Sequence, residues 1–195
     1  MPKDVLRVHG RSNLHTNLDE ARSVELEVQS QTISAGHGIN VIHVRMITTP
    51  RPVNLNDLYE MDIAIELERA KAATEWVSQF SDPDWLPEGT HQLTVIPSSD
   101  KMTFVKPDAY VKRGKIYDKT PVTLLLEAYP ADDEFCLGIR MSASNSSENG
   151  QWFVSAKLNR LQSQVFYYML RINYEEIRHH KKFWEEWKKN RSSKT

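Results

Sequence analysis

Apolar and polar residues alternate most regularly between residues 135 and 158. Over residues 135–143 the large apolar residues share one parity, which is the period of a half-buried β-strand. Residues 144–150 are small or polar and end in Asn-Gly, which favours a tight turn because both residues tolerate positive φ. The alternation returns over residues 152–158. This pattern predicts a β-hairpin.

After Asn159 the apolar period changes to that of a helix. The stretch predicts a core-like helix that follows the hairpin directly, and residues 173–195 are expected to continue it as a basic, aromatic helix. The apolar residues at helical spacing are Leu161, Val165, Tyr168 and Ile172.

Two strands are predicted nearer the start of the chain. Apolar residues alternate with charged and amide residues over 24–29, which is typical of an edge strand with its charges outward. Residues 39–47 are apolar at both parities, so they predict a buried strand that forms a hairpin with the first. Residues 1–22 are mostly polar and predict a mobile arm. Further short strands are expected over residues 93–96, 102–105 and 122–128.

A long helix is predicted over residues 56–80. Asn54 or Asn56 can cap it, and apolar residues follow at i, i+3 and i+4 spacing over residues 58–80. Residues 62–68 also alternate in a way that suits a strand, but the caps and the continuing stripe favour a helix. The predicted fold class is therefore α+β: a twisted, mainly antiparallel sheet with this helix packed on one face and a C-terminal hairpin–helix unit.

Length and composition indicate one globular domain. The chain has 195 residues, of which 39% are hydrophobic and 26% are charged. We expect a flexible arm over residues 1–22, a single domain over 23–172 and a basic aromatic helix or tail over 173–195. No apolar run is long enough to span a membrane, and the N-terminus has neither an apolar leader nor Gly at position 2. The single cysteine, Cys136, excludes an internal disulfide and suits a reducing compartment.

Charge is unevenly distributed although the net charge is −1. Residues 171–195 hold eight Lys or Arg against four Glu, and residues 100–119 hold six against three Asp. Such basic patches are expected where a protein contacts lipid or nucleic-acid phosphates. The alternatives are that the charges form solvated faces and that the aromatic residues cap the core. The candidate contact residues are Lys181, Lys182, Phe183, Trp184, Trp187, Lys188 and Lys189 in the C-terminal helix, and Lys112, Arg113 and Lys115 in the second patch.

Trp85 and Leu86 lie in a predicted loop that contains two prolines and a glycine. An apolar pair on a loop is either packed back into the core or offered to a membrane or another copy of the chain. Both interpretations stay open from the sequence.

We find no motif that indicates catalysis or a metal site. His179 and His180 are adjacent, so they point to different sides of a helix and do not chelate one metal together. Cys136 lies between apolar neighbours, which favours an inert thiol. The acidic residues 132–134 are expected to be solvated on a turn. We therefore expect a non-catalytic interaction protein that needs no cofactor.

The hairpin also carries a family resemblance. Residues 133–143 combine an acidic start with Phe, Gly-Ile-Arg and Ser-Ala, and residues 151–160 form a Trp-bearing return strand that ends in Asn-Arg. Further matching positions, in the same order, are residues 42–46, Arg51-Pro52, Asp57 and Lys119-Thr120-Pro121. Over residues 24–170 the chain resembles rhabdovirus matrix proteins, especially those of the lyssavirus branch.

The resemblance implies an α+β fold and a structural function. Matrix proteins of this family self-associate, condense the viral nucleoprotein–RNA complex and attach it to the anionic inner face of the membrane during virion assembly and budding. Envelope glycoprotein and host factors are further implied partners. The implied location is the virion beneath the envelope, together with the host cytoplasm and the inner face of membranes, with the nucleus as a further candidate.

The chain departs from the family in two respects. Residues 1–22 hold only four Lys or Arg against three acidic residues, and the usual late-domain motifs are absent apart from a YxxL match at residues 167–170. We therefore expect membrane or nucleoprotein contact to lie in the C-terminal helix and the 106–119 loop. The competing hypotheses are a nucleic-acid-binding or host-interfering accessory protein, an enzyme and another kind of interaction module.

Overall fold

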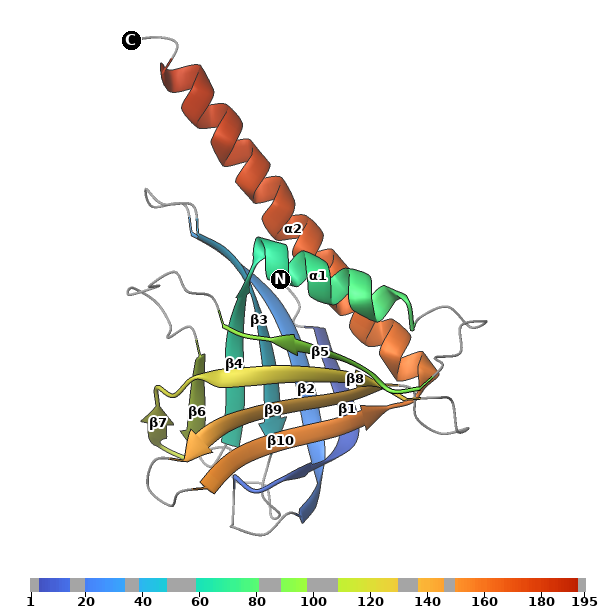
Figure 1. Ribbon diagram of the computed structural model, residues 1–195. Helices are drawn as coiled ribbons and strands as arrows, with labels where there is room; N and C mark the ends of the chain where they lie inside the picture. Colours follow the sequence, from blue (N-terminus) through green and yellow to red (C-terminus); the bar gives the residue numbers. More distant parts are fainter. Residues whose placement is uncertain are drawn as a thin grey trace.

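Ten β-strands form one sheet in which every neighbouring pair is antiparallel (Figure 1). The computed structural model describes residues 4–14, 20–33, 39–48, 59–80, 89–97, 109–129, 137–145 and 150–192. The strand order across the sheet is β5-β8-β9-β10-β1-β2-β3-β4-β6-β7. The strands are β1 (Asp4–Ser12), β2 (Glu20–Ile33), β3 (Ile39–Thr48), β4 (Tyr59–Glu66), β5 (His91–Val95), β6 (Ala109–Arg113), β7 (Ile116–Asp118), β8 (Val122–Ala128), β9 (Leu137–Asn145) and β10 (Gly150–Leu158).

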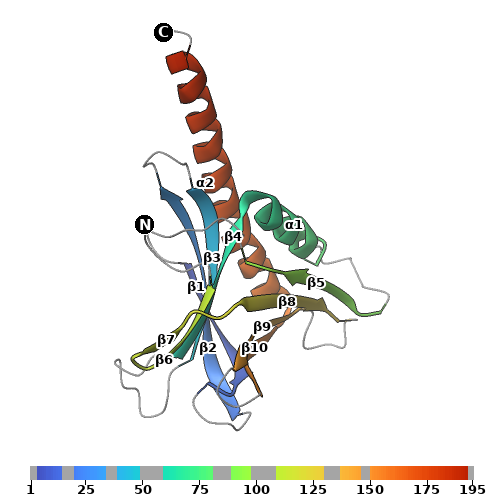
Figure 2. The same cartoon turned by 60° about the vertical axis from the view of Figure 1, so that its left-hand side comes forward.

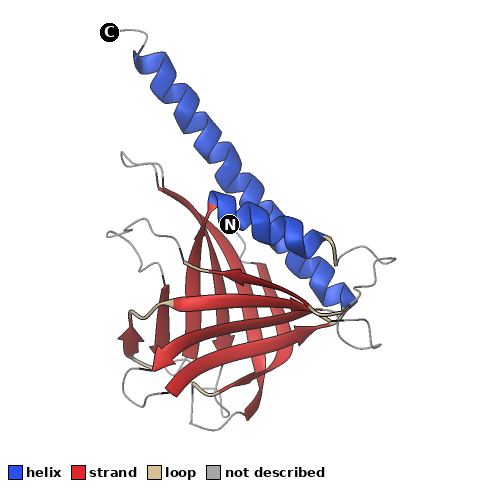
Figure 3. Cartoon of the chain, viewed as in Figure 1, coloured by secondary structure: helices blue, strands red, loops and turns tan. Residues whose placement is uncertain are grey.

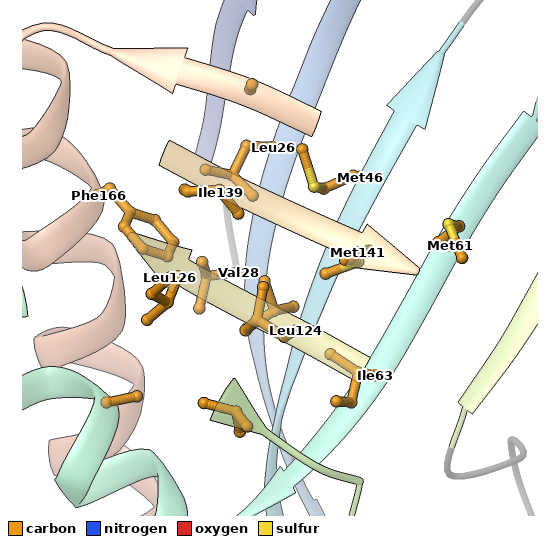
Figure 4. Close-up of a cluster of buried hydrophobic side chains, with 14 of the residues drawn as sticks. Leu26, Val28, Met46, Met61, Ile63, Leu124, Leu126, Ile139, Met141 and Phe166 are labelled. Carbon is orange, nitrogen blue, oxygen red and sulfur yellow. The ribbon is translucent and has the colours of Figure 1, made fainter. Parts of the chain in front are cut away.

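The sheet curls so strongly that its two halves face each other across one hydrophobic core. Five strands separate β8 from β4 in the sheet, yet the two are in contact. Figure 4 shows Leu124 of β8 and Met141 of β9 reaching toward Ile63 of β4. All three side chains are fully buried. Burial of apolar surface on both inner faces is the main stabilising contribution to such a fold.

Two helices pack at one end of the curled sheet (Figures 2 and 3). Helix α1 (Leu67–Ser78) contacts β3, β4 and β5, and it lies against α2 (Arg160–Ser192). Helix α2 contacts β1, β2, β3 and β10 with its first half. The C-terminal part of α2 extends beyond the sheet.

The α+β class and the C-terminal hairpin–helix unit are confirmed. Strands β9 and β10 pair in register from Leu137 with Leu158 to Asn145 with Gly150, and α2 begins two residues after β10 ends. The buried strand predicted over residues 39–47 is β3, and all its residues from Val41 to Thr48 are buried. The strands predicted over 93–96 and 122–128 correspond to β5 and β8. The one predicted over 102–105 lies outside the described residues.

The helix predicted over residues 56–80 is wrong in its first half. Residues Tyr59–Glu66 form β4, and α1 begins only at Leu67. The strand places Met61, Ile63 and Ile65 on the core face. It also turns Asp62 the other way, toward a basic side chain of β3, which a helix at this position would not do. The alternating pattern over 62–68 was therefore the informative one, and residues 56–58 lie outside the described part.

The mobile arm predicted over residues 1–22 is wrong for residues 4–12. They form β1, which pairs with β10 on one side and with β2 on the other. Backbone hydrogen bonds on both sides hold this strand although its only fully buried apolar residue is Val8. Gly10 permits the close approach, since a Cβ there would collide with the carbonyl of Ser155 and the side chain of Val24. The sequence predicted an edge strand over residues 24–29. Strand β2, which contains these residues, instead lies inside the sheet, between β1 and β3.

Candidate interaction site on the C-terminal helix

A reciprocal pair of hydrogen bonds fixes the start of α2. The backbone N–H of Gln162 donates to Oδ1 of Asn159 at 2.9 Å, and the N–H of Asn159 donates to Oε1 of Gln162 at 3.0 Å. This is a capping box, in which two N–H groups that the first helical turn leaves unpaired are both satisfied. The residues that the hairpin supplies at its end therefore also set where the helix begins.

The first half of α2 is anchored to the sheet by one apolar face and by two polar contacts. Phe166, Leu170 and Ile177 are buried in the core. Oδ1 of Asn173 accepts from the backbone N–H of Ser30 at 2.6 Å, and the Ser30 hydroxyl donates to Glu176 at 2.6 Å. These contacts stabilise the direction in which the rest of the helix leaves the domain.

The apolar stripe that the sequence identified on this helix faces solvent, not the core. The exposed fractions are 68% for Leu161, 39% for Val165, 55% for Tyr168 and 59% for Ile172. Sequence periodicity correctly placed these four residues on one face of the helix. It wrongly predicted that this face packs against the core. We call these four residues the α2 seam. In the YxxL match, Tyr167 is half-buried and Leu170 is buried.

The second half of α2 carries the predicted aromatic residues. Trp184 lies against Phe183 and Trp187, with ring centroids 6.4 Å and 5.0 Å apart. Phe183 is 61% exposed and Trp187 is 41% exposed. The guanidinium of Arg191 lies 4.8 Å from the centre of the Trp187 ring. The alternative in which these aromatic residues cap the core is therefore wrong for Phe183 and Trp187.

Positive charge surrounds this aromatic group. We define the basic end as residues 178–192, in which six Lys or Arg stand against two Glu. The four predicted lysines are all exposed, and the helix there is covered by no other element in Figures 1 and 2. The basic end therefore presents cations and large aromatic surfaces together, at one pole of the molecule. The lysines are Lys181, Lys182, Lys188 and Lys189.

The second predicted patch lies elsewhere. Lys112 and Arg113 are on β6, and Lys115 is exposed in the turn to β7. Figures 1 and 2 place this hairpin at the end of the sheet opposite to the basic end. Arg113 is used internally, with its guanidinium 4.8 Å from the centre of the Trp152 ring. The two patches do not form one surface, and Trp85 and Leu86 lie outside the described residues.

A buried charge network that sequence reasoning missed crosses four adjacent strands. Glu27, Arg45, Asp62 and Tyr110 are direct cross-strand neighbours on β2, β3, β4 and β6. Nε of Arg45 donates to Asp62 at 2.9 Å, and its Nη1 donates to Glu27 at 3.4 Å. The alternation of Glu27 with apolar neighbours was visible in the sequence, but its partner is 18 residues away and the pairing depends on the register.

His43 extends this network. Its Nδ1 donates to Asp62 at 2.6 Å, and its Nε2 lies 2.7 Å from Oε1 of Gln31. Burial alone would raise the pKa of Asp62, but the hydrogen bond from His43 and the charges of His43 and Arg45 outweigh it, so this pKa lies below its usual value. The Asp62 side chain is fully buried and that of His43 is 6% exposed. The pair therefore holds strands together in a place that solvent does not reach.

Neighbouring groups have raised pKa values for the same reasons. Burial, together with the charges of Asp62 and Glu60, raises the pKa of Tyr110, whose hydroxyl donates to Glu60 at 2.8 Å. Burial lowers the pKa of Arg45, but the charges of Asp62, Tyr110 and Glu60 outweigh it and raise the value overall. These shifts favour the charged forms of Asp62 and Arg45 and the neutral form of Tyr110.

Within the described ranges, no group of three or more His, Cys, Asp or Glu residues is arranged to hold a metal ion. Among the helices of that same part, none is long and apolar enough to cross a membrane.

Comparison of the chain with protein-family models, with curated proteins and with solved structures gave no match.

Proposed function

We propose that this chain is a non-catalytic structural protein of the viral matrix type. It self-associates, condenses a ribonucleoprotein and links it to the anionic inner face of a membrane during virion assembly. The observation that carries the proposal is the basic end of α2, which extends beyond the domain with Phe183, Trp187 and its lysines exposed. The resemblance of residues 24–170 to rhabdovirus matrix proteins supplies the biological setting.

The basic end has the chemistry of an interfacial membrane contact. Tryptophan favours the boundary between headgroups and acyl chains, and each Lys or Arg near an anionic surface contributes about 1 kcal/mol. Six such cations within residues 178–192 outnumber two Glu, so the attraction adds up along the helix. Apolar aromatic surface then adds binding that salt does not screen.

The position of residues 4–12 strengthens this assignment. Matrix proteins of the resembling family use a basic N-terminal arm, but here these residues are a strand in the middle of the sheet. They are thus committed to the fold. Among the described residues of the two basic patches, the exposed Phe and Trp side chains, Phe183 and Trp187, lie on α2 beside the cations.

Nucleic acid is the alternative ligand for the same residues, because aromatic rings stack on bases and lysines contact phosphates. Flotation of the full chain with vesicles tests the two. We expect binding to vesicles that contain phosphatidylserine, little binding to neutral vesicles, and persistence of part of the binding at high salt. Salt-sensitive binding to single-stranded RNA without vesicle binding would contradict the membrane proposal and favour the accessory-protein alternative.

A further inference from the structure

The α2 seam is an apolar surface that no described element covers. Leu161, Val165, Tyr168 and Ile172 are between 39% and 68% exposed, whereas the opposite face of the same helix is buried against the sheet. We propose that the α2 seam is the contact through which two copies of this chain pair, with their α2 helices side by side and parallel. This proposal names the contact surface for the self-association in the proposed function, and it depends on that part of the proposed function alone.

The spacing of the seam is that of a two-stranded coiled coil. Its residues are four, three and four positions apart, which matches alternating d and a positions of a heptad. Val165 and Ile172 then take the a positions, and Leu161 takes a d position. β-branched residues at a with Leu at d favour a parallel pair over higher oligomers. The second copy is therefore a partner whose surface matches this spacing.

Charges beside the seam also fit a parallel pair. Arg171 occupies the g position before Ile172, and Glu176 occupies the following e position. In a parallel pair g faces e of the other helix, so Arg171 meets Glu176 of the second copy on both sides of the seam. The contact uses Oε1 of Glu176, because Oε2 accepts from the Ser30 hydroxyl of its own chain. Arg171 is exposed and makes no ion pair with any described residue.

The seam is short, and this sets the strength that we expect. Helix α2 is already held in shape by its buried face, so pairing does not have to nucleate the helix. Four residues per chain bury less than the roughly 800 Å² per partner of a standard interface. We therefore expect a weak dimer whose population depends on concentration.

Pairing at the α2 seam would place two basic ends on one particle. The next heptad positions after Ile172 are Glu175, His179 and Lys182, which are polar, so the apolar contact stops there. In a parallel pair both basic ends then project from the same end of the dimer, and they do not pack against each other. Two such ends on one particle bind a surface far more strongly than one, because the second contact becomes intramolecular.

Sedimentation equilibrium over a range of protein concentrations tests the surface. Ile172→Glu should raise the dimer dissociation constant at least about tenfold, because it places charge in the seam. The matched control is Ile116→Glu on β7, since Ile116 is 57% exposed and Ile172 is 59% exposed. The control should dimerise like the wild-type chain. Equal dimerisation of Ile172→Glu and wild type would overturn the proposal.

Disulfide trapping tests the orientation. Leu161→Cys in a Cys136→Ser background should form a covalent dimer on oxidation, because parallel helices set position 161 against itself. An antiparallel pair centred on the seam would separate the two thiols by about 16 Å along the helix, beyond the roughly 4.5 Å between Cβ atoms that a disulfide spans. Absence of the cross-link in a chain that still dimerises would overturn the parallel arrangement.

Charge exchange provides a third test. Arg171→Glu should weaken the homodimer, because it sets a carboxylate against Glu176 of the second copy. Glu176→Arg also removes the acceptor of the Ser30 hydroxyl within its own chain, so this variant is used in a mixture with Arg171→Glu, in which the two should form a heterodimer. A mixture that pairs no better than either variant would contradict the assigned g-to-e contact. A wild-type chain that stays monomeric would overturn this proposal and also the self-association in the proposed function. A dimer that ignores all these substitutions would overturn the α2 seam alone.

Discussion

Trp184 donates a hydrogen bond from Nε1 to Nε2 of His180, one helical turn earlier, at 3.1 Å. The other ring nitrogen of His180 lies 2.7 Å from Oδ1 of Asn40 on β3. Because an indole N–H only donates, Nε2 of His180 accepts from Trp184, and Nδ1 is left to donate to Asn40. His180 thus connects a contact between α2 and the sheet to the aromatic residues of the basic end.

This relationship predicts the effect of His180→Ala. The substitution removes both hydrogen bonds, each of which contributes about 0.5–1.5 kcal/mol, so residues 181–192 should lose helix while the sheet stays folded. Hydrogen exchange read by mass spectrometry should show faster exchange over these residues. The matched control is His179→Ala, since the His179 side chain is 73% exposed and its nearest carboxylate oxygen is 3.9 Å away. Equal exchange in both variants would contradict the anchoring role.

Asp62→Asn should destabilise the fold strongly. Asp62 accepts from both His43 and Arg45, so the variant removes the carboxylate partner of His43 and leaves Arg45 with Glu27 alone. Removing one partner of a buried ion pair costs about 3–5 kcal/mol. Urea denaturation measures this loss. Glu25→Gln provides the comparison, because Glu25 pairs at 2.8 Å with an Arg7 side chain that is 77% exposed. We expect its cost to stay below about 1 kcal/mol.

The lowered pKa of Asp62 predicts that the fold loses stability at low pH. The pKa of Asp62 is lower in the folded than in the unfolded chain, where it is about 3.9. The unfolded chain therefore binds the proton first, and the stabilisation is complete above pH 4 or so and lost as pH falls below that value. The difference in free energy of unfolding between wild type and Asp62→Asn should shrink between about pH 4 and pH 2. A difference that stays constant over this range would contradict the assignment.

The raised pKa of Tyr129 predicts that the fold loses stability at high pH. Burial and the hydrogen bond to Glu127 raise the pKa of Tyr129 to about 12, whereas an unfolded tyrosine titrates near pH 10. Its contribution is therefore complete below about pH 10 and is lost as the pH rises from there toward 12. Tyr129→Phe should remove that part of the pH dependence, as measured by denaturation at a series of pH values.

The hairpin–helix unit was predictable because its signals are local. Alternation, an Asn-Gly turn and the change to helical spacing after Asn159 all lie within residues 135–172. Strand β1 was not predictable from the sequence. It contains few apolar residues, and backbone pairing with the strands on both sides holds it in place. Residues 62–66 satisfied both a helical and an alternating pattern. The choice between them depended on the Asp62 contacts with β3, which have no local signature.

The candidate site was predictable in composition but not in orientation. The lysines and aromatic residues of the basic end could be read from the sequence, and the structure leaves the lysines, Phe183 and Trp187 exposed. Helix α2 however has two apolar faces, one with Phe166, Leu170 and Ile177 and the other with the α2 seam. Periodicity alone does not distinguish the face that meets the sheet from the one that meets solvent. That choice depends on the sheet surface with which α2 packs.

The most direct test of the account is flotation of a charge-reversal variant with vesicles that contain phosphatidylserine. Lys181, Lys182, Lys188 and Lys189 are changed together to Glu. The control changes four other exposed lysines to Glu, namely Lys71, Lys115, Lys119 and Lys157, so that both variants have the same net charge. The account predicts that the first variant loses vesicle binding and that the control keeps most of it. Equal binding by the two variants would contradict the assignment of the basic end as the membrane contact.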